Sequence, residues 1–530
     1  MRFAGNLLWI LAAGLGFAAQ DLPAQQLPAQ NLPAPDLKDL EKRVTEFSLP
    51  NGAHFIVLER HDAPLISFHM RLNAGSLYDP AGQTGLAHLV ERLAFKGTES
   101  IGTRNWAEEK KALDAIEEVY DRMEAEANKG LKADQSRVDM LRTQARLAIE
   151  NARRSVVANE YQRIFSENGA AALEARTTNA AAEFSVTLPS NRGELWFLME
   201  SQRLQHPAFR EVYAERDASV AEYRQHTESA QGRVLGELVA TAFTAFPYRN
   251  PLTGWPNDVS NLRRGDVKAF FERYYVPGNI TVVICGDADP AEIKRLAERY
   301  FGPMAAKSMP PLFHADEPPQ AGPRTTVVEI PGDPILAVSY KRPSQYDRDD
   351  AVFDLIQLVV GQGRSGLLRS LAVEEKHVAV NTQVVATFPD GRGPSLFTFL
   401  LFPAPGHTVE ENQQALEDVL QRLKTTPLDE QTLARAKAQG RATVLRRLGS
   451  NGQMAELLAL CHAEYGGWRK LFTNLEALKA VTAEQVTRVA NRYFVATGRT
   501  TAYSVLPGQS DPPRPAAKPQ TAPRKGGQAQ

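Results

Sequence analysis

The sequence has few cysteines, almost no net charge and no long apolar segment at its start. Its two cysteines, Cys285 and Cys461, are too few and too far apart for a disulfide framework, although a single bond between them stays open, as does their redox state. Cys285 lies in the apolar run 281–286, which is typical of a buried strand. Lysine and arginine total 61 against 62 acidic residues, so the charge does not indicate a nucleic-acid partner.

The N-terminus has the pattern of a targeting segment. Arg2 precedes the apolar run Leu7–Ala13, and small residues follow at 16–18. This run is too short to span a membrane comfortably, so we predict a cleavable signal peptide (1–18) and no stable membrane span. An uncleaved anchor is the lesser alternative. Export to the periplasm or outside the cell is the expected localisation.

Length and composition predict more than one folded unit. The 530 residues with 43% hydrophobic content are enough for at least two domains. Three segments rich in proline or in small and polar residues frame these domains: a linker (19–37), a second linker (303–324) and a disordered tail (509–530). We therefore expect one domain at 38–302 and another at 325–508.

Residues 85–98 are the most informative stretch. Leu86, Leu89 and Val90 recur with helical spacing, and His88, Glu91 and Arg92 fall on the opposite side of the same helix. Thr84 is the expected N-cap and Gly97 the expected stop. Strands are predicted before this helix, at 54–59 and 66–72. One face of the helix anchors it, and the other presents an imidazole, a carboxylate and a guanidinium together.

This stretch resembles the pitrilysin/insulinase family of zinc metallopeptidases, the inverzincins, which includes the mitochondrial processing peptidase and bacterial relatives. In the family motif His-x-x-Glu-His the two histidines hold zinc and the glutamate polarises water. The resemblance implies that His88 is a residual zinc ligand and Glu91 the general base. Arg92 stands at the second ligand position. A guanidinium has no lone pair to give and does not deprotonate in proteins, so we expect weak or absent zinc binding and an ion pair from Arg92 to Glu222 or Glu91.

A second stretch carries two glutamates seven residues apart. Glu215 and Glu222 therefore share one face of a predicted helix. The resemblance implies that Glu222 is the distal zinc ligand and Glu215 a supporting acid. His226 follows one turn later. We interpret it either as a substitute ligand or, with more support, as a surface histidine.

The segment from Asn179 to Pro189 reads as a strand running into a turn. The resemblance implies that its start, Asn179 and Ala180, belongs to a sheet edge against which an extended peptide lies. An ordinary amphipathic strand without a binding role is an equally good interpretation.

Two further patterns complete the predicted fold. Residues 107–165 have two heptad-like runs and predict a helical insertion, either a hairpin or an antiparallel coiled coil. The segments 262–267 and 273–276 recur at a constant offset as 481–486 and 492–495, which indicates an internal duplication. The fold class expected over 40–508 is α+β, with two homologous halves enclosing a cleft. Each half is an antiparallel-rich sheet with helices on one side.

Three functions remain open from sequence. The favoured hypothesis is a non-catalytic or strongly impaired homologue that binds peptide or unfolded protein and forms a heterodimer with an active family member. The alternative is an active zinc endopeptidase with altered ligation through His88, Glu222 and either water or His226. It has fewer than the three protein ligands usual for catalytic zinc, and Arg92 adds a repelling charge. A structural envelope protein that binds no peptide is the third.

Overall fold

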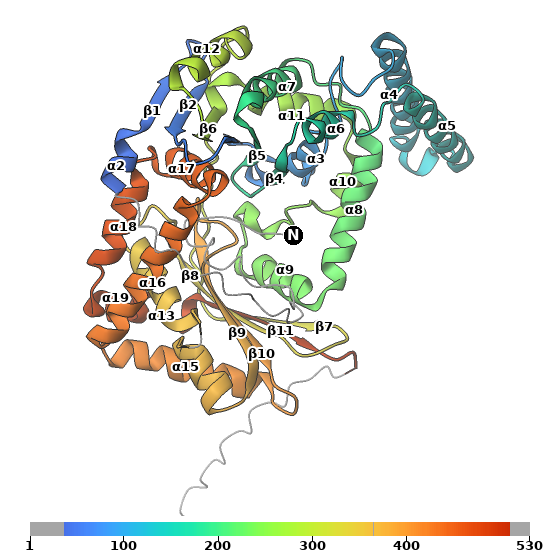
Figure 1. Cartoon of the computed structure of the whole chain (residues 1–530). Coiled ribbons are helices and arrows are strands. Elements are labelled where there is room, and N and C mark those ends of the chain that lie inside the picture. Colours follow the sequence, from blue (N-terminus) through green and yellow to red (C-terminus); the bar gives the residue numbers. More distant parts are fainter. Residues whose placement is uncertain (1–36, 364, 509–530) are drawn as a thin grey trace, which may run out of the picture.

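The computed structural model describes residues 37–363 and 365–508. The predicted signal peptide, nearly all of the first linker and the tail lie outside these residues. Figure 1 shows two sheets, one in the upper and one in the lower part of the view, each accompanied by helices. This confirms the predicted α+β fold with two halves. Within the described ranges, no helix combines the length and apolar character needed to cross a membrane.

The first sheet has six strands in the spatial order β1-β2-β6-β3-β5-β4. All neighbours are antiparallel except β2 and β6, which are parallel. In chain order the strands are β1 (Val44–Ser48), β2 (His54–Glu59), β3 (Leu65–Leu72), β4 (Ala171–Thr177), β5 (Ala182–Pro189) and β6 (Ile280–Gly286).

The second sheet repeats this arrangement with five strands in the order β7-β11-β8-β10-β9. Its one parallel pair is β7 and β11, which corresponds to β2 and β6 once the extra edge strand β1 of the first sheet is set aside. The strands are β7 (Arg324–Glu329), β8 (Leu336–Arg342), β9 (Ala379–Phe388), β10 (Ser395–Pro403) and β11 (Arg499–Val505). Because the strand orders match, the duplicated segments have equivalent positions in the two halves. Each segment contributes the helix that precedes the last strand of its half: α11 precedes β6, and α19 precedes β11.

The helices of the first half are α2 (Leu37–Lys42), α3 (Leu86–Arg92), α4 (Trp106–Ala127), α5 (Gln135–Arg153), α6 (Glu160–Glu167), α7 (Gly193–Gln205), α8 (Val212–Glu228), α9 (Ala230–Ala242), α10 (Pro256–Asn261), α11 (Arg264–Tyr274) and α12 (Pro290–Tyr300). Those of the second half are α13 (Asp350–Gly361), α14 (Leu367–Arg369), α15 (Val409–Thr425), α16 (Glu430–Leu448), α17 (Asn451–Tyr465), α18 (Lys470–Ala480) and α19 (Ala483–Tyr493).

Each half contributes one helix that packs against the sheet of the other half. On β2, Phe55 and Val57 pack with helices of the first half, while Ile56 and Leu58 pack on the opposite face with α17 from the second half. In return, α9 from the first half packs against β7, β8 and β11. Because both faces of β2 are buried, this strand has a continuous apolar run rather than an alternating pattern. Cys285 and Cys461 lie in the interface with α17, both buried and both free.

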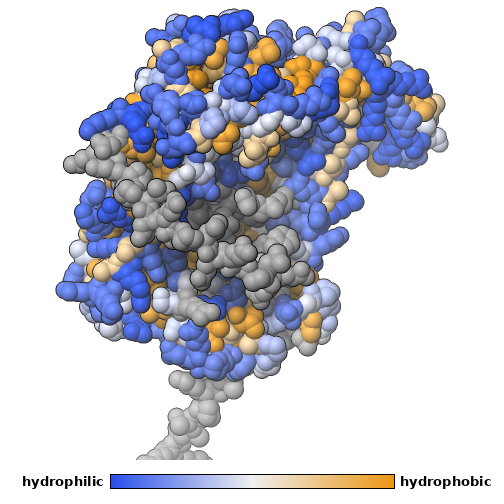
Figure 2. Space-filling view, in the orientation of Figure 1, coloured by the Kyte–Doolittle hydropathy of each residue, from blue (hydrophilic) through white to orange (hydrophobic). Residues whose placement is uncertain are grey.

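The predicted helical insertion is present as the antiparallel hairpin of α4 and α5, which projects from the molecule and has a largely hydrophilic surface (Figures 1 and 2). Asn105 and Asp134 cap the two helices through their side chains. The range predicted for the insertion extended too far. Tyr161 and Phe165 of α6 are fully buried in the core of the first half, so the hairpin ends with α5.

Candidate functional site

The first half places the predicted site on α3, and the start of this helix is fixed by an unexpected cap. The carboxylate of Asp79 accepts hydrogen bonds from the backbone N–H groups of Gly85 and Ala87, both at 2.8 Å. Thr84, the predicted N-cap, instead donates to Asp258 on α10. Gly85 has φ +87°, and a Cβ there would meet the carbonyl oxygen of Thr253 at 2.4 Å, so this position requires glycine.

The end of α3 also differs from the prediction. The helix ends at Arg92, and Leu93 is its C-cap, well before Gly97. His88 and Arg92 nevertheless lie one turn apart on the same helix. The predicted grouping of His88, Glu91 and Arg92 on one side therefore holds.

Helix α8 brings the two predicted glutamates to this face of α3. Glu222 Oε2 lies 3.1 Å from His88 Nε2 and 2.9 Å from Arg92 Nη1. Glu215 Oε2 accepts from Arg92 Nε at 2.9 Å and lies 2.8 Å from Nη2. Glu91 Oε2 lies 3.3 Å from His88 Nδ1. All five side chains predicted from the motif and from the glutamate spacing therefore meet in one cluster.

Arg92 is the centre of this cluster. Its guanidinium spans the two glutamates of α8, so the predicted ion pair with Glu222 is confirmed, whereas the second acidic partner is Glu215 rather than Glu91. The oxygen of Glu222 that accepts from Arg92 is also the one that faces His88. His88 and Glu222, the two side chains predicted as residual ligands, thus face each other with an arginine beside them.

Sequence reasoning missed two contributors to the cluster. Lys96 places its Nζ atom 2.6 Å from Glu215 Oε1 and 3.3 Å from Glu211. Thr177, at the end of β4, donates its hydroxyl to Glu91 Oε2 at 3.4 Å. The spacing of Lys96, four residues after Arg92, was a signal for the first. Nothing local linked Thr177 to Glu91, because the two are brought together only by the packing of α3 on β4.

The opposite charges of the cluster stabilise one another, which raises the pKa of the histidine and lowers the pKa of the two glutamates of α8. Burial opposes the charged form of His88, but hydrogen bonds to Glu222 and Glu91 outweigh it and raise the pKa of His88 to about 9. Burial would raise the pKa of Glu222 and of Glu215, yet both are lowered, Glu222 by His88 and Arg92 and Glu215 by Lys96 and Arg92. The cluster is therefore an ion-pair network of cations and carboxylates.

Two parts of the sequence match family profiles that belong together. Residues 55–127 match the profile described as "Insulinase (Peptidase family M16)", and residues 261–439 match the one described as "Peptidase M16 inactive domain". The chain belongs to peptidase family M16. The second profile covers segments from α10 to α16, whereas the helix carrying His88 lies in the first, so the word "inactive" in that description does not refer to this cluster.

Relatives of this M16 chain match it over most of its length. The zinc protease PqqE of Helicobacter pylori is 24% identical over 468 residues, which are 86% of this chain and 91% of that protein. A probable mitochondrial-processing peptidase subunit beta of Arabidopsis thaliana is 21% identical over 470 residues, 86% of this chain and 76% of that protein.

Solved structures share the fold. The crystal structure of a protease from Helicobacter pylori has a TM-score of 0.73 at 21% identity and covers 87% of this chain and 99% of its own. An M16 inactive domain from Pseudomonas fluorescens has a TM-score of 0.65 at 15% identity, covering 87% and 97%.

The zinc that M16 relatives are named for does not fit this donor set. A catalytic zinc site has three protein ligands and an open position, and here Arg92 occupies one ligand position with a cation. The alternative set of His88, Glu222 and His226 does not converge either. In residues 37–363 and 365–508, the only His, Cys, Asp and Glu side chains that bring three ligand atoms within 4.8 Å of one another are Glu46, His54 and His462.

The residues predicted to contact substrate, Asn179 and Ala180, are not in an edge strand. They lie in the bend between β4 and β5, and β5 is paired on both sides. The carbonyl oxygen of Asn179 accepts from the backbone of Leu77, so this segment supports the turn before α3. The edge strand on this side of the sheet is β4, whose Thr177 donates to Glu91; β1 is the other edge strand. The edge was misplaced because β4 is rich in alanine and charged residues, which are poor strand formers.

Proposed function

We propose that this protein is a non-catalytic M16 homologue that binds extended peptide and acts together with a catalytically active family member. The observation that carries the proposal is the position of Arg92, held by Glu215 and Glu222 where the family motif has its second ligand histidine. A fixed positive charge in a half-buried site repels a divalent cation and supplies no lone pair.

The alternative, a zinc endopeptidase with altered ligands, needs His226 or water to replace the missing histidine. His226 does not join His88 and Glu222 in a group of three close ligand atoms. Two protein ligands are fewer than catalytic zinc sites use. The alternative therefore has less support than a pseudoenzyme.

Peptide binding and pairing have separate support. Strand β4 is one of the two edge strands of the first sheet, and an extended peptide can add to such an edge through main-chain hydrogen bonds. Relatives of this chain include proteins named as alpha and beta subunits of the mitochondrial processing peptidase, names that denote a paired enzyme. A purely structural protein would need neither feature.

Export to the periplasm or the medium is part of the proposal. It rests on the signal-like pattern of residues 1–18, which lie outside the described residues. The mass and N-terminal sequence of the mature protein from its native host test it. A mature chain that retains Met1 would contradict cleavage and favour an anchor or an internal location.

The central test measures peptidase activity and His88-dependent zinc together. We expect the purified full chain to cleave no denatured protein substrate, and Glu91→Gln to change nothing. We also expect His88→Gln to leave the bound zinc unaltered, as measured by elemental analysis after dialysis. Cleavage that Glu91→Gln abolishes, or zinc that His88→Gln removes, would overturn the proposal.

Pairing and peptide binding need a second experiment. The full chain is mixed with the product of a gene from the same genome that has an intact His-x-x-Glu-His motif, and complex formation is followed by sizing and light scattering. Binding of a labelled unfolded polypeptide is measured by fluorescence anisotropy. We expect both interactions. If neither occurs, the structural role replaces the present proposal.

A further inference from the structure

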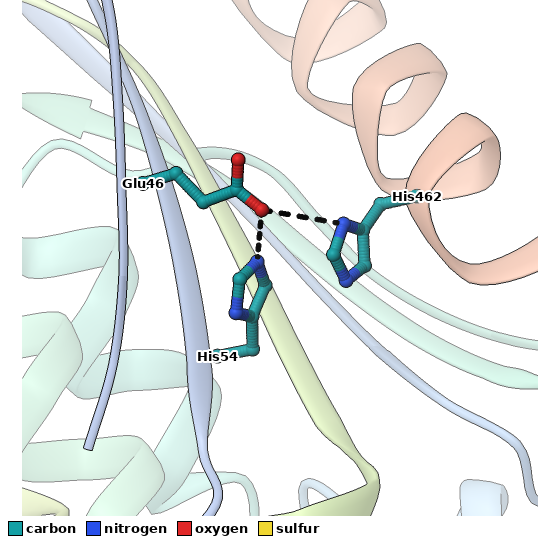
Figure 3. Close-up of side chains that lie close together, drawn as sticks. All are labelled: Glu46, His54 and His462. Atoms are coloured by element: carbon teal, nitrogen blue, oxygen red, sulfur yellow. Dashed lines mark ion pairs between the residues drawn. The ribbon is translucent and has the colours of Figure 1, made fainter. Parts of the chain in front are cut away.

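A second cluster of potential ligands lies where the two halves meet. Glu46 comes from β1, His54 from the neighbouring β2, and His462 from α17 of the second half (Figure 3). One oxygen of Glu46 faces both rings. It lies 3.1 Å from His54 Nε2 and 3.9 Å from His462 Nδ1. The cluster is far from Arg92 in the sequence and shares no residue with the network of α3 and α8.

The two ring nitrogens that face Glu46 are buried, and neither makes a hydrogen bond of good geometry. Among the described residues, His54 Nε2 and His462 Nδ1 are two of the buried side-chain atoms without such a hydrogen bond, although each lies near the carboxylate. Buried polar atoms are nearly always satisfied, so two such atoms in one place need an explanation. Both nitrogens face one carboxylate oxygen, and this groups three potential metal-ligand atoms within 4.8 Å of one another.

The outer contacts of the cluster hold these atoms in place. Ser48 Oγ lies 2.9 Å from His54 Nδ1, the ring nitrogen that points away from Glu46. Trp468 donates its indole N–H to Glu46 Oε2 at 2.8 Å, leaving Oε1 directed at the histidines. Metal-binding histidines and carboxylates are typically oriented by such second contacts on their remaining atoms.

The charge state of the rings suits a cation. Burial lowers the pKa of His54 despite the neighbouring Glu46. Burial and then His54 lower the pKa of His462 to about 4. A neutral imidazole carries a lone pair on one ring nitrogen, and that nitrogen can bind a cation. Arg469 lies at the other oxygen of Glu46, with its Nη1 atom 3.7 Å from Oε2.

We propose that Glu46, His54 and His462 bind a divalent transition-metal ion of the zinc type, which links the first sheet to α17. Two imidazole nitrogens and one carboxylate oxygen suit zinc and exclude calcium and magnesium, which take oxygen ligands. Three protein ligands leave a fourth position for water.

Binding requires a small rearrangement. The two rings are stacked, with centroids 4.2 Å apart and planes at 13°. A metal lies near the plane of each imidazole that binds it, at about 2.0–2.1 Å from the nitrogen, so the rings must turn apart about their side-chain torsions. The separation of His54 Nε2 and Glu46 Oε1 already suits two ligands of one ion. Loss of ring stacking is thus an expected consequence of binding.

The test uses the full chain, stripped with a chelator and titrated with Zn²⁺ alone by calorimetry. We expect one ion per chain, with affinity at least about 100-fold weaker in His462→Gln, since removing a ligand costs at least as much as removing its orienting partner. The matched control is His61→Asn. His61 also lies between two carboxylates, Glu59 and Asp287, but it is exposed and both its nitrogens are engaged. We expect this variant to bind like the parent.

A second measurement distinguishes the loss of zinc binding from misfolding of a variant. Zn²⁺ should raise the thermal midpoint of the parent and of His61→Asn but not that of His462→Gln, and circular dichroism checks that each variant is folded. No zinc binding by the parent overturns this inference and leaves the proposed function intact. Binding that persists in His462→Gln but vanishes in His88→Gln overturns both, because it locates the ion at the family position.

Discussion

The two histidine-glutamate clusters of this molecule have opposite electrostatics. Between α3 and α8, Arg92 and Lys96 neutralise Glu215 and Glu222, and both nitrogens of His88 face carboxylates. At the junction of β1, β2 and α17, burial lowers the pKa of both imidazoles, and a single carboxylate oxygen faces both rings. The site predicted from the motif is thus an ion-pair network, whereas the Glu46, His54 and His462 cluster groups three potential ligand atoms. Membership of a family therefore indicates where a site is expected but does not establish which chemistry the site performs.

The largest effect is expected from a substitution that makes the cluster between α3 and α8 resemble the cluster of Glu46, His54 and His462. Arg92→His places an imidazole one turn from His88 on the same face, with Glu222 as third ligand and Glu91 near the water position. We expect zinc affinity at this cluster to rise by on the order of 100-fold or more, since a repelling charge becomes a ligand. Calorimetry in the His462→Gln background isolates this ion from the other. Peptidase activity is a secondary readout.

If that variant folds and binds zinc no better than its parent, the cluster has lost more than one ligand. The assignment of Glu222 would then be wrong. Arg92→Lys serves as the control, because it keeps a cation and should gain no zinc.

The next effect is on stability. The side chains of Glu215 and Glu222 are only 13% and 17% exposed, and Arg92 is 27% exposed. Arg92→Ala leaves two half-buried carboxylates with less compensation. We expect a loss of about 1–3 kcal/mol in the free energy of unfolding, below the cost of breaking a fully buried pair. Urea denaturation measures it.

A surface ion pair provides the comparison for that loss. Arg295 and Glu292 pair on α12 with 58% and 47% exposure, and such pairs contribute about 0–1 kcal/mol. Arg295→Ala should therefore unfold almost like the parent. An Arg92→Ala variant that is equally unaffected would mean that the network contributes little.

The two clusters should also respond to pH in opposite directions in metal-free protein. The folded-state pKa of His88 is raised from 6.5 to about 9, so its stabilisation is complete below pH 6.5 and is lost as pH rises toward 9. The pKa of His462 is lowered to about 4, so the unfolded chain binds its proton first and stability is lost as pH falls from 6.5 toward 4. His88→Gln should flatten the alkaline decline, and His462→Gln the acidic one.

Thermal midpoints across this pH range check both slopes. Identical slopes in His88→Gln and the parent would show that His88 does not keep its proton in the folded state. The same comparison applies to His462 on the acidic side.

The smallest effect concerns orientation rather than ligation. Trp468→Phe keeps the ring but removes the hydrogen bond to Glu46 Oε2. We expect zinc affinity at the second cluster to fall by about 10-fold, the lower end for a partner that only orients a ligand. Calorimetry measures it. An unchanged affinity would mean that the carboxylate is held without the indole.

The fold and the first cluster were largely predictable because their signals are local. Apolar spacing identified α3, and a two-turn interval placed Glu215 and Glu222 on one face of α8. The cap from Asp79 was missed since it comes from a separate turn rather than from the residue before the helix. The edge strand was misplaced because β4 carries weak strand propensity and an irregular register near Ala172, which has φ +52°.

The second cluster could not be predicted from sequence. His54 and His462 lie in different halves, and no spacing rule connects residues so far apart in the chain. They meet only because α17 packs on the first sheet. Tertiary packing, which local patterns do not encode, thus produced the one converging ligand group in the described part of the chain.

The exchange of α17 has a consequence for synthesis on the ribosome. The strands β2 and β6 leave the exit tunnel long before α17, so Ile56, Leu58 and Val283 have no cover during most of translation. An uncovered apolar sheet face is a target for chaperones and for aggregation. Nascent chains stalled before residue 451 should therefore bind a hydrophobic dye strongly, and release of the full chain should abolish that binding. The second face of the first sheet is covered only after α17, which lies in the last quarter of the chain, has been made.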